Sequence, residues 1–198
     1  MYWYEDEVKR LENDGLKNGF GADTIFYGSS TMRLWTSLST DFESLKPVNL
    51  GFGGSTLAAC VWFFERIMTN YHPKKLVVYA GDNDLGDGRH PEEVFIFFQQ
   101  LVVKVSKQFG DIPCYFVSLK PSVSRWNMAD QFKFTNNIIE TEIVKHDGNW
   151  HFIDVFKQMI DAQGRPKKEY FVSDGLHLSE KGYQLWKEVI NSYIAGNG

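Results

Sequence analysis

Short apolar runs alternate with longer segments of helical periodicity along most of this chain. The runs are rich in β-forming residues and cover residues 24–27, 47–50, 76–80, 114–118 and 151–153. Apolar side chains recur with helical spacing in residues 56–69, 91–109, 127–145 and 179–194, and a further helix is expected at 5–17. Strands that alternate with helices pair in parallel and need helices on both faces. The pattern therefore predicts an α/β fold of three layers, with about five parallel strands.

Length and composition are those of one globular domain. With 198 residues, of which 43% are hydrophobic, the chain can bury a substantial core, and we expect a single domain over residues 1–198. A net charge of -4 argues against a nucleic-acid partner. Cys60 and Cys114 lie in apolar runs and are expected to be buried free thiols. Because no signal peptide or membrane-length apolar run is recognisable, we expect a cytoplasmic protein without stable membrane association.

Small and polar residues follow four of the predicted strands. They occupy residues 28–31 after the first strand, 51–56 after the second, 81–84 after the third and 174–177 after the fifth. The carboxyl ends of parallel strands lie at one edge of the sheet, and sites in such folds form there. We therefore expect the four segments to meet in a single active site.

The first and last of these segments together suggest a serine nucleophile. Gly28 permits a sharp turn, and Ser29 or Ser30 would then lie beside free N–H groups that can stabilise an oxyanion. His177 can take the hydroxyl proton, and Asp174, three residues earlier, can orient the imidazole. Taken alone, the serine motif is better explained as a turn with a helix cap. The Asp-His pair would be equally plausible as two solvated surface side chains or as a pair of metal ligands, although no further cluster has ligand spacing.

The two middle segments offer further oxyanion donors. Residues 51–56 invite comparison with a dinucleotide-binding loop, but Thr56 stands where that pattern requires a small residue, and the phosphate-loop pattern is absent. The backbone N–H of Gly54 is instead the natural donor to an oxyanion. Asn83 can donate its side-chain amide to the same oxyanion, although Asn/Asp/Gly turns are common in their own right.

With these residues assembled, the chain resembles the SGNH hydrolases, also called GDSL hydrolases, whose four marker blocks match in order from Gly28 to His177. The resemblance implies a three-layer α/β/α sandwich similar to flavodoxin, and an esterase or acylhydrolase activity without metal or organic cofactor. It also implies the site residues: Ser30 as nucleophile, the Ser30 and Gly54 N–H groups and the Asn83 side chain as oxyanion donors, Asp174 as orienting carboxylate and His177 as base. The segment from Lys120 to Trp126 is similar to one in bacterial lysophospholipase-like members, and it brings no known role.

One position departs from the family pattern. The first block usually reads Gly-Asp-Ser, whereas here Ser29 replaces the aspartate. Alignment on Gly28 favours Ser30 over Ser29 as the attacking group, and Ser29 is expected to leave the nearby loops more adaptable. The expected reaction is ester hydrolysis through an acyl-enzyme, in which His177 takes the Ser30 proton and returns it to the leaving alcohol.

The substrate is expected to be a small soluble ester, with an acetyl ester of a carbohydrate as the preferred example. Trp35, Trp62 and Trp126 are candidates to line an acyl or sugar pocket, although such aromatic residues more often pack in a core. Two alternatives remain: a non-catalytic ligand-binding module of the same fold, and a nucleotide-binding flavodoxin-like protein. The sequence does not fix the oligomeric state.

Overall fold

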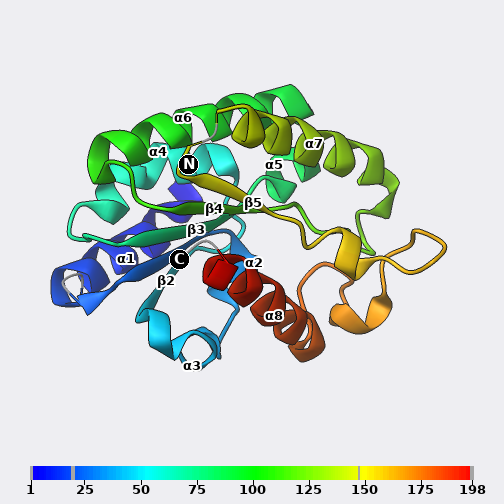
Figure 1. Ribbon diagram of the computed structural model, residues 1–198, viewed down its shortest axis with the longest axis horizontal. Helices are drawn as coiled ribbons and strands as arrows, with labels where there is room; N and C mark the ends of the chain where they lie inside the picture. The colour runs from blue at the N-terminus through cyan, green and yellow to red at the C-terminus, as the bar shows by residue number, and fades with distance from the viewer. Residues whose placement is uncertain (1, 19–20, 147, 197–198) are drawn as a thin grey trace.

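A five-stranded, all-parallel sheet forms the centre of the protein in the computed structural model, which describes residues 2–18, 21–146 and 148–196 (Figure 1). The strands lie in the order β2-β1-β3-β4-β5. In chain order they are β1 (Thr24–Gly28), β2 (Pro47–Gly51), β3 (Lys75–Tyr79), β4 (Cys114–Val117) and β5 (Trp150–Ile153). Each predicted strand is present within about a residue of its expected ends, and the predicted fold class is confirmed.

Helices cover both faces of the sheet and complete three layers. In Figure 1, α4, α6 and α7 lie on one side of the sheet, and α3 and α8 lie on the other. The α-helices are α1 (Glu5–Asn18), α2 (Ser30–Arg33), α3 (Leu38–Asp41), α4 (Leu57–Met68), α5 (Asp82–Gly86), α6 (Pro91–Phe109), α7 (Ala129–His146) and α8 (Glu180–Gly196). Short 3-10 turns are η1 (Tyr2–Tyr4), η3 (Glu43–Leu45), η4 (Trp126–Met128), η5 (Lys157–Met159) and η6 (Lys168–Tyr170).

The ends of the long helices follow local sequence signals. Helix α6 begins at Pro91, where the missing proline N–H costs nothing, and His90 and Glu93 form a capping box. It ends before Gly110, which has a positive φ of 69°. Helix α4 is capped by Thr56, whose side chain accepts a hydrogen bond from the N–H of Ala59.

The core lies on both faces of the central strands. Every residue of β1 and β4 is buried, as expected for strands covered on two sides. Cys60 and Cys114 are both buried free thiols, which confirms that prediction. Trp35 is also buried, in edge-on contact with Phe42 and Trp186, so this candidate pocket residue belongs to the core.

The strand order creates a switch point in the middle of the sheet. The chain passes from β1 outward to β2, and then crosses back to place β3 on the other side of β1. β1 and β3 are therefore neighbours, and the chain leaves their carboxyl ends in opposite directions. In open α/β sheets a crevice forms at this point, and the serine and asparagine segments both start there.

Candidate active site

Gly28 places the serine segment against the neighbouring strand. Its φ is 143°, and a Cβ on this residue would collide with the carbonyl oxygen of Tyr79 in β3. The turn allows the Ser29 N–H to donate to that oxygen and lets α2 begin at Ser30. As the first residue of α2, Ser30 has a peptide N–H with no intrahelical acceptor. Only glycine fits this position, which explains the glycine at the end of the strand.

Ser30, His177 and Asp174 form a continuous chain of short contacts. Ser30 Oγ lies 3.0 Å from His177 Nε2, and His177 Nδ1 lies 2.7 Å from Asp174 Oδ2. A carboxylate can only accept, so Nδ1 carries a proton and Nε2 of the neutral ring is free to accept from the serine hydroxyl. This is the arrangement in which an imidazole can remove a hydroxyl proton.

The Asp174 carboxylate is held in its ionised form by its own turn. Oδ1 accepts the N–H groups of Leu176 and His177 at 2.8 Å and 2.9 Å, and Gly175 takes a positive φ of 66°. Burial acts to raise the pKa of Asp174, but the hydrogen bonds from the His177 ring and these two N–H groups outweigh it and lower the pKa to about 2. Both side chains project from this turn on the same side as Ser30.

Ser29 and Ser30 have different surroundings, although both follow Gly28. Ser29 is 1% exposed, and its hydroxyl has no hydrogen-bond partner among the described residues. Ser30 is half-buried and contacts His177. Of the two serines, the structure therefore brings Ser30 to the imidazole.

The glycine-rich loop after β2 is tied to the serine turn. The N–H of Phe52 and the hydroxyl of Ser55 both donate to the carbonyl oxygen of Gly28, at 3.0 Å and 3.1 Å. Gly54 lies between them with a φ of 67°, and a Cβ there would meet nothing within 4 Å. The hydroxyl of Tyr4, from the N-terminal turn η1, donates to the Gly54 carbonyl oxygen at 2.9 Å. The Gly54 peptide is thus fixed beside the serine segment with open space at its Cα.

Asn83 connects the third segment to the second. Its Nδ2 donates to the carbonyl oxygen of Ser55 at 3.0 Å, and its Oδ1 accepts from Nη2 of Arg125 at 3.0 Å. One amide hydrogen is therefore used in holding the loop, and the second is left for another acceptor. Through Ser55 and Gly28, all four predicted segments belong to one hydrogen-bonded group with His177.

A carboxylate of the chain itself occupies the N-terminus of α4. Asp84 accepts the N–H groups of Leu57 and Ala58, the first two of that helix. Burial raises the pKa of Asp84 to about 6, against these hydrogen bonds and the nearby Arg89. The helix terminus is the place where a phosphate would bind in the nucleotide-binding alternative, and Asp84 already fills it.

Sequence reasoning missed a buried ion pair beneath the site. Nζ of Lys120 lies 3.1 Å from Oδ2 of Asp82, 3.1 Å from the Tyr79 hydroxyl and 3.2 Å from Thr31 Oγ1. The Lys120 and Asp82 side chains are 1% and 4% exposed. Burial opposes ionisation of Asp82, but the Lys120 and Arg125 cations outweigh it and keep the pKa of Asp82 below its usual value. A lysine three residues after the end of an apolar strand was the available signal.

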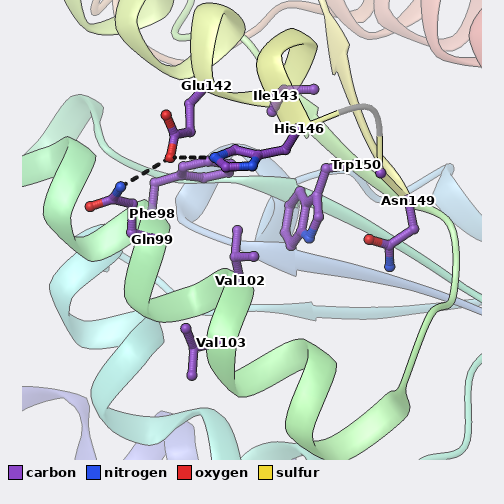
Figure 2. A pocket seen from close by; sticks show the side chains of 10 residues that line it. Phe98, Gln99, Val102, Val103, Glu142, Ile143, His146, Asn149 and Trp150 are labelled. Atoms are coloured by element: carbon purple, nitrogen blue, oxygen red, sulfur yellow. Dashed lines mark hydrogen bonds and ion pairs between the residues drawn. The ribbon is translucent and has the colours of Figure 1, made fainter.

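A separate hollow of about 320 Å³ lies between α6, α7 and β5, away from these residues (Figure 2). Its floor is apolar, with Phe98 and Trp150 facing it, and Glu142 at its rim contacts Gln99 and His146. None of the four segments contributes a side chain to it. Trp62, another candidate pocket residue, is 68% exposed on α4, and Trp126 is half-buried in η4.

Within the described ranges, no group of three His, Cys, Asp or Glu side chains is arranged to hold a metal ion. In the same part of the chain, no helix is long and apolar enough to cross a membrane.

A family model and solved structures both match this chain. The sequence model of the GDSL-like Lipase/Acylhydrolase family matches residues 17–185. A comparison with curated protein sequences found no match.

Solved structures share the fold at low sequence identity. A candidate platelet activating factor from Streptococcus pneumonia aligns with a TM-score of 0.81 and 20% identity, covering 97% of this chain and 94% of that one. A GDSL-like lipase from Bacteroides thetaiotaomicron aligns with a TM-score of 0.77 and 17% identity, covering 96% and 100%. The acetyl xylan esterase AlAXEase aligns with a TM-score of 0.71 and 18% identity, covering 86% and 98%.

The matched range, residues 17–185, includes the serine turn, the glycine-rich loop, Asn83 and the Asp174–His177 turn. The chain belongs to the GDSL-like lipase/acylhydrolase family and is a carboxylic ester hydrolase.

Proposed function

We propose that the protein hydrolyses carboxylic esters through a Ser30–His177–Asp174 triad and a covalent acyl-enzyme. The observation that carries this proposal is the unbroken set of contacts from Ser30 Oγ through the imidazole to the carboxylate, at 3.0 Å and 2.7 Å. A hydroxyl is a weak nucleophile at neutral pH, and only an adjacent base makes it effective. The depressed pKa of Asp174 keeps the carboxylate charged, so it can stabilise the imidazolium that forms.

In the first half of the reaction, Ser30 Oγ attacks the acyl carbon while its proton passes to Nε2 of His177. The carbonyl oxygen becomes an oxyanion, and the N–H groups of Ser30 and Gly54 with the free amide hydrogen of Asn83 stabilise it. His177 then gives its proton to the alkoxide oxygen of the leaving alcohol as the carbon–oxygen bond breaks. The acyl group stays on Ser30.

In the second half, water replaces the alcohol. Nε2 of His177 takes a proton from the water as its oxygen attacks the acyl-enzyme, and the same donors stabilise the second oxyanion. Collapse of this intermediate breaks the bond to Ser30 Oγ, which recovers its proton from His177. The carboxylic acid leaves, and no metal or organic cofactor takes part.

For the substrate we propose small, soluble esters, with acetyl esters first. An acetyl xylan esterase shares the fold at 18% identity, and this likeness directs the choice of the first substrates to test. A short acyl group also needs no long channel beside Ser30.

The test is hydrolysis of p-nitrophenyl acetate, butyrate and octanoate by the wild type and by two matched variants. Ser30→Ala should lose several orders of magnitude in kcat, because the nucleophile is gone. Ser29→Ala is the control, since Ser29 lies next in the chain but its hydroxyl has no hydrogen-bond partner among the described residues. It should retain activity. A Ser30→Ala enzyme with most of the wild-type kcat would refute the triad assignment.

Active-site labelling checks the covalent step separately. A fluorophosphonate probe reacts with an activated serine and not with an unactivated one, so it should label the wild type and Ser29→Ala but neither Ser30→Ala nor His177→Ala. Labelling of Ser30→Ala at Ser29 would transfer the role to the neighbouring serine. Faster turnover of acetate than of octanoate would support the substrate proposal, and the reverse order would contradict it.

A further inference from the structure

The segment after β4 lies between two parts of the candidate site. The N–H of Ser124 donates to the carbonyl oxygen of Gly175, at 3.0 Å, in the turn that carries Asp174 and His177. The next residue, Arg125, reaches in the other direction to the start of α5, where Asn83 lies. Two consecutive residues thus connect the turn that carries His177 to the segment that carries Asn83.

Both terminal nitrogens of the Arg125 guanidinium group donate hydrogen bonds to the start of α5. Nη1 donates to the carbonyl oxygen of Asp82 at 2.9 Å, and Nη2 donates to Asn83 Oδ1 at 3.0 Å. Nη1 also lies 3.5 Å from the Asp82 carboxylate. A planar fork that binds a backbone and a side-chain oxygen of adjacent residues fixes the side chain relative to the backbone.

Gly86 provides the space for this arrangement. A Cβ at Gly86 would lie 2.9 Å from both Cζ and Nη2 of Arg125. Its φ is not in the left-handed region, so the backbone itself does not require glycine here. The absence of a side chain at Gly86 therefore leaves the space that the guanidinium group of Arg125 occupies.

The arginine and the Ser55 carbonyl oxygen together set which way the Asn83 amide points. A guanidinium group has only donors, so the amide end that faces Arg125 must be the oxygen. The NH₂ group is then directed away, with one hydrogen on the Ser55 carbonyl oxygen and the other available. A rotated amide would set N–H groups of Asn83 against those of Arg125 and would present its oxygen to the developing oxyanion.

We propose that Arg125 is a positioning residue that holds the Asn83 amide in its donating orientation and polarises it. This inference rests on the proposed function, because it assigns Arg125 a role through an oxyanion donor of that site. The positive charge of the guanidinium group beside the amide oxygen draws electron density from the NH₂ group. The free N–H of Asn83 then becomes a stronger hydrogen-bond donor.

The experiment is a double-mutant cycle on p-nitrophenyl acetate with Arg125→Ala, Asn83→Ala and both together. Arg125→Ala should lower kcat about tenfold or more with KM changed less than about twofold, since the interaction is made in the transition state. Asn83→Ala should lower kcat about a hundredfold or more. In the Asn83→Ala background, loss of Arg125 should change kcat less than about twofold. Arg10→Ala, an exposed arginine on α1, is the control and should keep wild-type kcat.

Two results would overturn the inference. One is an equal kcat loss from Arg125→Ala with and without Asn83, which would mean that the arginine acts independently. The other is a wild-type kcat in both Arg125→Ala and Arg125→Lys. If Arg125→Ala fails to fold, Arg125→Lys decides, because a lysine keeps the charge but cannot bridge both oxygens, and its kcat should still fall.

Chemical rescue separates positioning from general support of the fold. Millimolar guanidinium chloride should raise the kcat of Arg125→Ala but not that of the double variant, which lacks the amide to be oriented. Equal stimulation of both would count against the proposal. Failure of the proposed function is distinguishable, because then Ser30→Ala itself would remain active. If Ser30→Ala is inactive while Arg125→Ala is fully active, only the present inference fails.

Discussion

Replacement of Lys120 by methionine should leave the Asp82 carboxylate as a buried charge that has lost its main partner. The pair is 3.1 Å apart, and both side chains are almost fully buried. Removing one member of a buried ion pair costs about 3–5 kcal/mol, because the other charge stays desolvated. Arg125 remains 3.5 Å from Asp82, so we expect a loss near the lower end, about 3 kcal/mol.

Urea denaturation of three proteins tests this estimate. At pH 7, Lys120→Met should lose about 3 kcal/mol of unfolding free energy. The double variant Lys120→Met/Asp82→Asn should recover most of this loss, because neither charge is then buried. A single variant within about 1 kcal/mol of the wild type, or a double variant no more stable than the single, would refute the reasoning.

The pH dependence has a definite sign. In the wild type the pKa of Asp82 is depressed, so its contribution to stability is present at neutral pH and is lost as the pH falls through the folded-state pKa. Without Lys120 the carboxyl is left in a desolvated site, and protonation should relieve the penalty. The gap in unfolding free energy between wild type and Lys120→Met should therefore narrow from pH 7 toward pH 4.

Three further predictions concern other buried groups. Gly28→Ala should lower the free energy of unfolding by at least about 2 kcal/mol in urea titrations, since its φ of 143° is strained for alanine and the methyl group meets Tyr79. The pKa of Asp84 is raised to about 6, so its contribution to stability is lost as the pH rises through 6. The wild type should thus gain about 1–3 kcal/mol relative to Asp84→Asn between pH 7 and pH 4.5, and a constant difference would contradict this. Burial raises the pKa of Cys60 and Cys114, so a thiol reagent should react with neither before unfolding.

Much of the fold and of the contact geometry could be predicted because both depend on local signals. Apolar runs of three to five residues indicate the strands, and Pro91 and Thr56 mark helix starts. The rule that parallel strands end at one edge then placed the serine, glycine, asparagine and histidine segments together. The structure shows these contacts, while the catalytic roles of the residues remain predictions.

The supporting residues could not be predicted, since they depend on distances across the sheet. Lys120 and Asp82 are 38 positions apart in sequence, and nothing local pairs them. The contact of Arg125 with Asn83 spans 42 positions and requires the missing side chain of Gly86. Likewise, the sequence around Trp35 does not show whether its ring lines a pocket or packs in the core. Only the packed structure shows that it is buried.

The contact of Tyr4 with Gly54 has a practical consequence for handling the protein. Tyr4 lies outside the region matched by the family, yet its hydroxyl holds the carbonyl oxygen of the peptide that carries a proposed oxyanion donor. Tyr2, two residues earlier, is 95% exposed. An affinity tag or an immobilising linker fused at the N-terminus would therefore adjoin a segment that contacts the loop of this proposed oxyanion donor. A tag at the C-terminus, beyond α8, would not adjoin Tyr4.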